Sequence, residues 1–217
     1  MSRLDKNSAW SLQFITHATP KYDHLAGAKL ALDGGCRWIQ LRMKEATIDE
    51  LLQVGKQLRQ LTHTYHATMI LDDHVELVEE LEADGVHLGL QDMPIAEARS
   101  LLGKDKIIGG TANTIEDIAQ HYTSGADYIG CGPYRFTQTK KQLAPTLGLE
   151  GYRYILQQMA TRQITLPLIA IGGIESKDLP LLKKIGIKGV AISGAILRAA
   201  QPSKETKHVI QLLKEES

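Results

Sequence analysis

The sequence has few residues of several types, and each scarcity excludes a class of protein. Only two cysteines occur among the 217 residues, Cys36 and Cys131, and neither belongs to a CxxC pair. A disulfide framework and a zinc site are therefore not expected. Aromatic residues make up 5% of the chain and the formal net charge is zero. The chain thus lacks the stacking platforms and the basic surface of a nucleic-acid-binding protein.

Long hydrophobic runs are also missing. No run approaches the roughly 20 apolar residues of a membrane span. The N-terminal residues Met1 to Ser8 are polar and lack the apolar segment of a signal peptide. We therefore expect a cytoplasmic protein with reduced thiols and no membrane partner.

What the sequence does contain is a regular alternation of short β-type apolar runs with longer segments of helical period. The eight expected strands are 12–16, 38–41, 68–71, 85–88, 106–109, 128–131, 168–171 and 189–193. The expected helices are 20–32, 48–62, 75–81, 94–102, 114–123, 149–159, 179–185 and 205–214. Eight such periods in 217 residues predict an α/β fold, a single (β/α)₈ TIM barrel over residues 1–217. Its active site is expected at the carboxyl ends of the strands.

One irregular stretch interrupts this pattern. Residues 132–148 (GPYRFTQTKKQLAPTLG) show no clear periodicity and lie between the sixth strand and its helix. A long loop inside a compact domain is usually functional or disordered. Because a βα loop of a barrel opens onto the active-site face, we expect a mobile loop that serves the site.

Charged residues gather where the expected strands end. Arg42 and Lys44 follow the second strand, and Lys140 lies in the irregular stretch; converging cations of this kind suit a phosphate or pyrophosphate. Asp73 and Asp92 follow the third and fourth strands. Since Mg²⁺ is usually held by one or two carboxylates plus substrate phosphate oxygens, these positions predict a metal-bound pyrophosphate.

A second anion site is indicated after the last two strands. Gly172 and Gly173 end the seventh strand, and Ser193 and Gly194 end the eighth. This is the corner at which barrels of this type commonly bind phosphate through backbone N–H groups. The pattern therefore favours a site for two anionic groups.

Each of these residues has a simpler interpretation when it is taken alone. A single Arg or Lys is usually a solvated surface charge, and Asp72 and Asp73 also suit the cap of a following helix. His87 lies inside a strand, which fits a packed, hydrogen-bonded histidine better than a catalytic one. The joint placement of the polar residues at one end of the barrel favours a binding site.

Together these segments resemble the thiamine phosphate synthase family over essentially the whole chain. The matching stretches are 40–44 (QLRMK), 71–73 (LDD), 84–89 (DGVHLG) with Asp92, 108–111 (IGGT), 132–133 (GP) with 137–140 (TQTK), 170–174 (AIGGI) and 191–193 (AIS). No single stretch is specific, but their order and spacing are. The resemblance implies a Mg²⁺-dependent transferase that joins a hydroxymethylpyrimidine diphosphate to a thiazole phosphate, or to its carboxylated form. Thiamine phosphate and pyrophosphate are the implied products.

The resemblance also implies roles for individual residues. The implied substrate-binding residues are Gln40, Leu41, Arg42, Met43, Lys44, Asp72, Thr111, Thr137, Gln138, Thr139, Lys140, Gly173, Ile192 and Ser193. Among these, Arg42, Lys44, Thr111 and Lys140 are the implied catalytic residues, and Asp73 and Asp92 the implied Mg²⁺ ligands. The family chemistry is dissociative, so pyrophosphate leaves first and the thiazole nitrogen attacks the resulting carbocation. Small-molecule substrates are the expected partners, and a homo-oligomer is compatible with the sequence.

Some positions depart from the family pattern. Asp72 stands where asparagine is usual, His74 replaces an arginine, Leu90 replaces a glutamine and Thr111 replaces a serine. Two other functions compete with the synthase. A related thiazole tautomerase would carry a functional histidine at the position of Asn113, and a degenerate barrel could act as a phosphate-ligand sensor without catalysis.

Overall fold

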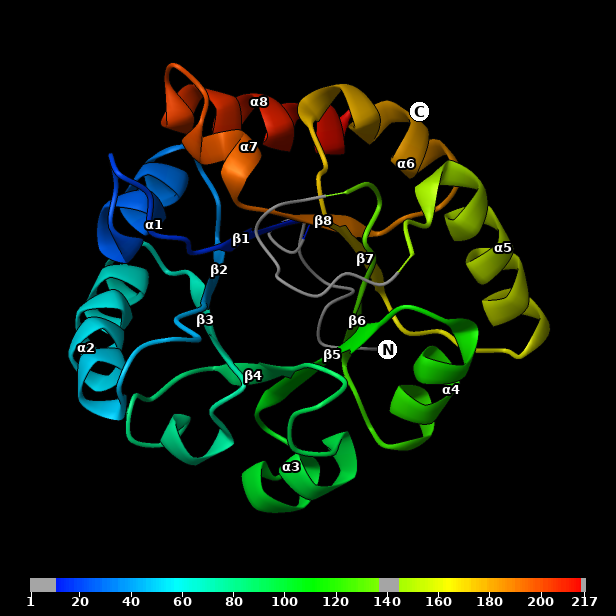
Figure 1. Ribbon diagram of the computed structural model, residues 1–217, viewed down its shortest axis with the longest axis horizontal. Coiled ribbons are helices and arrows are strands. Elements are labelled where there is room, and N and C mark those ends of the chain that lie inside the picture. Colours follow the sequence, from blue (N-terminus) through cyan, green and yellow to red (C-terminus); the bar gives the residue numbers. More distant parts are fainter. Residues whose placement is uncertain (1–10, 137–144, 216–217) are drawn as a thin grey trace.

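The computed structural model describes residues 11–136 and 145–215, which form a closed barrel of eight parallel strands (Figure 1). The strands are β1 (Leu12–Ile15), β2 (Trp38–Leu41), β3 (Thr68–Asp72), β4 (Gly85–Leu88), β5 (Ile107–Ala112), β6 (Tyr128–Cys131), β7 (Leu168–Ile171) and β8 (Gly189–Ile192). Each strand pairs with the next along the chain, and β1 pairs with β8 to close the barrel. The predicted TIM barrel is therefore confirmed.

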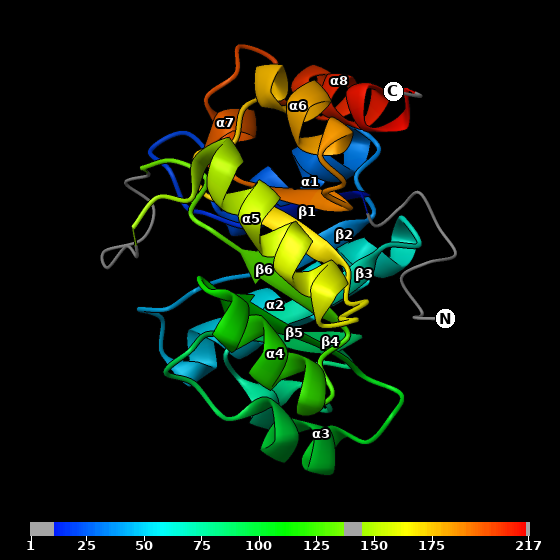
Figure 2. The ribbon, with the colours of Figure 1, turned by 90° about the vertical axis from the view of Figure 1, so that its right-hand side faces the viewer.

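Helices surround the barrel as an outer ring (Figures 1 and 2). They are α1 (His24–Asp33), α2 (Ile48–Thr64), α3 (Ile95–Leu102), α4 (Ile115–Thr123), α5 (Gly148–Thr161), α6 (Leu179–Lys184), α7 (Gly194–Leu197) and α8 (Pro202–Lys214). The short helix α7 directly after β8 was not expected from the sequence. It lies at the same end of the barrel as the other strand-to-helix connections.

The connection between β3 and β4 differs from the α-helix predicted over 75–81. A 3₁₀ turn, Val75–Leu77, forms there and is followed by further turns. Val75, Val78 and Leu81 recur at every third residue, and all three are buried. Leu77 is buried as well, so the spacing of the apolar residues does not separate a 3₁₀ turn from an α-helix, and the helix predicted over 75–81 is reduced to the 3₁₀ turn Val75–Leu77.

Capping residues fix where two of the helices begin. Thr47 caps α2 in a capping box with Glu50, and Thr114 caps α4 in the same way with Asp117. In each box two backbone N–H groups at the helix start gain side-chain acceptors. The Asp117 carboxylate also accepts the N–H of Asn113 at 2.9 Å. The α4 cap therefore holds the chain where it leaves the end of β5.

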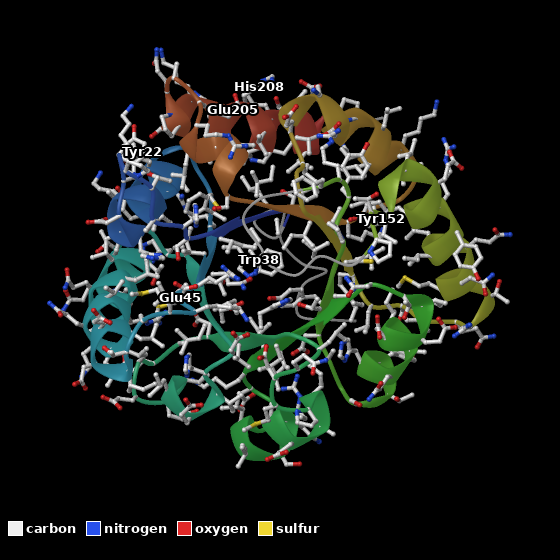
Figure 3. All side chains as sticks on the ribbon, in the orientation of Figure 1. Tyr22, Trp38, Glu45, Tyr152, Glu205 and His208 are labelled. Atoms are coloured by element: carbon white, nitrogen blue, oxygen red, sulfur yellow. The ribbon has the colours of Figure 1, made fainter. Side chains whose placement is uncertain are left out.

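Side chains fill the barrel interior, which is a packed core and not a pore. The interior cluster consists of Ile15, Trp38, Ile70, Ile107, Tyr128, Ile169 and Ala191. Trp38 and Tyr128 are fully buried and meet edge to face, with ring centroids 4.9 Å apart. Figure 3 shows Trp38 near the barrel centre, whereas Tyr152 lies between the strands and α5. Residues of the opposite strand face pack against the helices in a second, larger cluster.

Both cysteines belong to this outer cluster. Burial raises the pKa of Cys36 to about 11 and that of Cys131 to about 12. Both side chains are therefore protonated thiols near neutral pH, and neither is activated as a nucleophile. Within residues 11–136 and 145–215, no helix combines the length and apolar character that a bilayer crossing requires.

Candidate active site

A cavity of about 510 Å³ opens where the strands end. Nine of the residues that the sequence predicts for the site line this cavity. They are Gln40, Arg42, Lys44, Asp72, Asp73, Thr111, Gly173, Ile192 and Ser193. The fold thus brings residues from distant parts of the chain to one end of the barrel, as the strand order requires.

On one side of the cavity, cations and carboxylates lie in direct contact. The Asp72 carboxylate accepts a hydrogen bond from Gln40 Nε2 at 2.6 Å. Its other oxygen lies 3.6 Å from Arg42 Nε and 3.7 Å from Lys44 Nζ. Burial raises the pKa of Asp72, and the charges of Lys44 and Arg42 offset part of that effect. Asp72 therefore attracts both cations to this side of the cavity.

Asp73 is the closest partner of Lys44, with 2.6 Å between Oδ2 and Nζ. Burial lowers the pKa of Lys44, but the hydrogen bond to Asp73 and the charges of three aspartates outweigh it and raise that pKa overall. The Asp73 backbone has a φ of +69°, a left-handed conformation that asparagine and aspartate tolerate better than most residues. Its N–H donates to the His87 carbonyl at 2.9 Å, which fixes the direction of the side chain.

Asp92 lies beside the cavity and faces Asp73. Its Oδ2 accepts the N–H of Gly89 at 2.6 Å. Burial raises the pKa of Asp92, and the hydrogen bond and charge of Asp73 raise it further. Two carboxylates in mutual contact form a donor set that fits a divalent cation whose remaining ligands are waters and phosphate oxygens. Within the described residues, no group of three or more His, Cys, Asp or Glu forms a complete metal cage.

The opposite side of the cavity is built from backbone. Gly172 and Gly173 have φ values of +95° and +67°, so their N–H groups point where an L-residue's backbone rarely can. A Cβ on Gly173 would overlap the Arg135 side chain. The hydroxyl oxygen of Ser193 is buried and makes no hydrogen bond within the described residues. These groups leave hydrogen-bonding capacity for an anion.

An arginine pair flanks this second side. Arg135 donates to both carboxylate oxygens of Asp178 at 2.8 Å and to the Gly173 carbonyl at 2.7 Å. Arg198 also lines the cavity, packed against Gly194, where an added Cβ would overlap its guanidinium. Within the described residues, no carboxylate pairs with Arg198, which leaves its charge available to a ligand.

Two residues of the predicted substrate-binding set point away from the cavity. Leu41 is buried in the cluster between strands and helices, and Met43 packs against that cluster. Side chains alternate along a strand, so the neighbours Gln40 and Arg42 face inward while Leu41 faces outward. Leu41 and Met43 line no part of the cavity, and only their backbone can serve a ligand there.

The remaining predicted residues lie outside the described part of the chain. They are Thr137, Gln138, Thr139 and Lys140, and their assignment stays a prediction, as does the mobility of the loop. The two ends of residues 132–148 are held together. Leu147 N–H donates to the Pro133 carbonyl at 2.8 Å, and Tyr134 N–H donates to that of Ile171 at 2.8 Å.

Sequence reasoning missed several residues that line the cavity, among them two arginines and a histidine. Arg135 and Arg198 were not singled out, although both are charged residues that closely follow predicted strand ends. His87 was interpreted as a packed histidine. It is indeed buried and hydrogen-bonded, but it also lines the cavity, and its Nε2 lies 3.0 Å from Thr111 Oγ1.

The fold and the cavity together define a barrel enzyme that acts on phosphorylated small molecules. The sequence model of the family described as "Thiamine monophosphate synthase" matches residues 12–196. This chain therefore belongs to the thiamine monophosphate synthase family, as the motifs predicted.

Individual relatives agree with this assignment. The protein of Phocaeicola vulgatus named thiamine-phosphate synthase is 58% identical over 201 residues, which covers 93% of this chain and 97% of that protein. The thiamine-phosphate synthase of Bacteroides thetaiotaomicron is 56% identical over 202 residues, covering 93% and 97%. The solved thiamine phosphate pyrophosphorylase of Pyrococcus furiosus has a TM-score of 0.83 at 33% identity, covering 95% and 96%. The chain is accordingly an enzyme of thiamine biosynthesis with thiamine-phosphate synthase activity.

Proposed function

We propose that this enzyme joins a hydroxymethylpyrimidine diphosphate to a thiazole phosphate, or to its carboxylated form, and releases pyrophosphate, with CO₂ released as well from the carboxylated form. The observation that carries the proposal is the division of the cavity into two anion-binding sides. One side presents Arg42 and Lys44 with the Asp73 and Asp92 carboxylates. The other presents the glycine pair, the Ser193 hydroxyl and Arg198. A reaction that brings a diphosphate and a monophosphate together needs both.

The diphosphate belongs on the first side, where Asp73 and Asp92 would hold Mg²⁺. When bound there, Mg²⁺ would neutralise negative charge on the diphosphate. Lys44 contacts Asp73 at 2.6 Å, and Arg42 and Lys44 lie 3.6 and 3.7 Å from Asp72. Both cations would exchange carboxylate for phosphate contacts. Lys140, outside the described residues, is proposed to join them from the loop.

The chemical step we propose is dissociative. The C–O bond to the diphosphate breaks first, the bond electrons leave with pyrophosphate, and a pyrimidine-stabilised carbocation remains. The thiazole nitrogen then supplies the electron pair of the new C–N bond. Besides carboxylates and apolar side chains, the described cavity residues include four cations, two hydroxyls and several glycines. These cations, hydroxyls and glycine N–H groups can stabilise charge on the leaving group and hold the second reactant in place.

The direct test is to mix the protein with Mg²⁺ and both substrates and to measure pyrophosphate and thiamine phosphate. Both products should form in equal amounts. Isomerisation of the carboxylated thiazole without coupling would select the tautomerase instead. Binding of both substrates without turnover, under conditions in which a known synthase works, would select the phosphate sensor.

Replacing Arg198 by glutamine should raise the KM for thiazole phosphate at least about tenfold, since a charge-assisted hydrogen bond contributes about 1.5–3 kcal/mol. The reason is that Arg198 is a cavity arginine with no carboxylate partner among the described residues. Steady-state kinetics with each substrate varied in turn should show an unchanged KM for the pyrimidine diphosphate.

Arg162 provides the matched control, because it pairs with Glu116 on the helix layer and does not line the cavity. Arg162→Gln should leave both KM values unchanged. The unphosphorylated thiazole alcohol should be used equally poorly by the wild type and by Arg198→Gln. A thiazole phosphate KM that Arg198→Gln does not move would show that the phosphate lies elsewhere.

A further inference from the structure

A chain of hydrogen bonds crosses the barrel interior and ends at the cavity. Gln13 Nε2 donates to Tyr128 Oη at 3.1 Å, and Tyr128 Oη lies 3.1 Å from His87 Nδ1. His87 Nε2 in turn lies 3.0 Å from Thr111 Oγ1. The four residues come from β1, β6, β4 and β5. Gln13, Tyr128 and His87 are buried, and His87 and Thr111 line the cavity.

The donors in this chain determine its direction. An amide N–H₂ group only donates, so Tyr128 Oη accepts from Gln13 and has its single proton left to give. Burial raises the pKa of Tyr128 far above its ordinary value, which keeps that proton on the phenol. The proton goes to His87 Nδ1, so Nδ1 is an acceptor and the neutral ring carries its proton on Nε2.

The same logic extends to Thr111. A protonated His87 Nε2 donates to Thr111 Oγ1, at the observed 3.0 Å. The threonine oxygen thereby uses an acceptor site, and its own proton is free to point into the cavity. With the opposite tautomer, Thr111 would donate to His87 and present only lone pairs to an anion, which would repel it.

Packing holds the chain in this geometry. A Cβ on Gly109 would overlap the Tyr128 ring, and a Cβ on Gly130 would lie 2.9 Å from His87 Cε1. Both glycines thus leave the space in which the two rings sit. Trp38 closes the other side of Tyr128, edge to face at 4.9 Å between centroids. The two rings therefore have little room to turn.

We propose that Tyr128 and His87 are positioning residues that make Thr111 a hydrogen-bond donor toward the leaving diphosphate. The inference rests on the proposed function for the identity of the anion, but the proton arrangement stands on the contacts alone. A donor aimed at an oxygen that gains charge in the transition state accelerates the step. An acceptor in the same place would slow it.

The tautomer is tested first, by nitrogen-15 NMR of the imidazole nitrogens, which needs no turnover. In the wild type, His87 should show an unprotonated Nδ1 and a protonated Nε2. Tyr128→Phe should abolish this single tautomer. Tyr152→Phe removes another buried hydroxyl, one that donates to the Cys131 carbonyl at 2.6 Å, and should leave the His87 signals unchanged. A wild-type His87 protonated on Nδ1 overturns the proposal.

Kinetics then test the role of the chain. Tyr128→Phe should lower kcat roughly tenfold, with the KM for thiazole phosphate unchanged. Thr111→Ser keeps the hydroxyl and should keep most of the wild-type kcat. Thr111→Val removes the hydroxyl and should lose most of kcat. In the Thr111→Val background, Tyr128→Phe should add less than about twofold, because both act through one hydrogen bond. If the double variant instead loses kcat by the product of the two single losses, the proposal is overturned.

A different outcome would refute the proposed function and not the hydrogen-bond chain. In that outcome the wild type shows the predicted His87 tautomer but makes no thiamine phosphate.

Discussion

Replacing Asp73 by asparagine should lower the rate of pyrophosphate release at least tenfold, a loss of about 1.4 kcal/mol or more of transition-state stabilisation. Asparagine tolerates the left-handed backbone at this position, where φ is +69°, so the change removes charge and not conformation. It would take away one of the two carboxylates proposed to hold Mg²⁺. It also removes the partner that fixes Lys44 at 2.6 Å.

The measurement is pyrophosphate release against Mg²⁺ concentration. Asp73→Asn should need more Mg²⁺ for half-maximal rate as well as turning over more slowly. Asp49→Asn is the matched control, since Asp49 is an exposed residue in the first turn of α2. It should keep the wild-type rate. An Asp73→Asn enzyme with the wild-type rate and Mg²⁺ dependence would remove Asp73 from the metal site.

Replacing Trp38 by alanine should lower the free energy of unfolding by about 3–5 kcal/mol, the usual cost of truncating a large buried aromatic side chain. Trp38 is fully buried in the interior cluster and contacts Tyr128 edge to face. The closed barrel gives its neighbours little room to collapse into the space. Since domains are stable by only about 5–15 kcal/mol, much of the total would be lost.

Urea unfolding followed by circular dichroism measures this difference. Leu101→Ala provides the control, because Leu101 is 64% exposed on α3; its loss should stay within about 0.5 kcal/mol. Trp38→Phe should lower the free energy of unfolding by an amount between those of Trp38→Ala and Leu101→Ala. A Trp38→Ala protein as stable as the control would mean that the barrel interior repacks around the missing ring.

The barrel could be predicted from the sequence because its strands are short, apolar and regularly spaced. The strands 38–41, 85–88, 128–131 and 168–171 have the predicted bounds. Helix ends differ by a few residues, since caps such as Thr114 decide them locally. The helix predicted over 75–81 is reduced to the 3₁₀ turn Val75–Leu77, because a spacing of three and four residues between buried side chains does not distinguish the two helix types over so short a segment.

The sequence predicts those site residues that lie directly after the ends of the strands. Gln40, Arg42 and Lys44 line the cavity as expected, but the intervening Leu41 and Met43 do not. The alternation of side chains along a strand already predicts that Leu41 faces away from Gln40 and Arg42. The motif match over 40–44 assigned all five consecutive residues to the site and did not take this alternation into account.

Contacts between loops were beyond sequence reasoning. Arg135 donates a hydrogen bond to Asp178, which lies 43 residues away in the sequence. The sequence around either residue does not indicate that the other is its partner. The same holds for the Gln13 side chain, whose partner Tyr128 lies 115 residues away. Such pairs depend on how the barrel closes, and no local propensity encodes that closure.

The pairing of β1 with β8 also has a consequence for the synthesis of the chain. Leu12 is in register with Val190, so one edge of β1 stays unpaired in a nascent chain until nearly all of the chain has been made, although β2 can pair with the other edge. The cations after β2 and the phosphate corner after β8 meet only at that moment. Barrel closure and assembly of a working site are therefore one event, and its long-range contacts favour slow folding. A growing chain in the cell therefore cannot join the two substrates before β8 has been made, because the side proposed for the monophosphate does not yet exist.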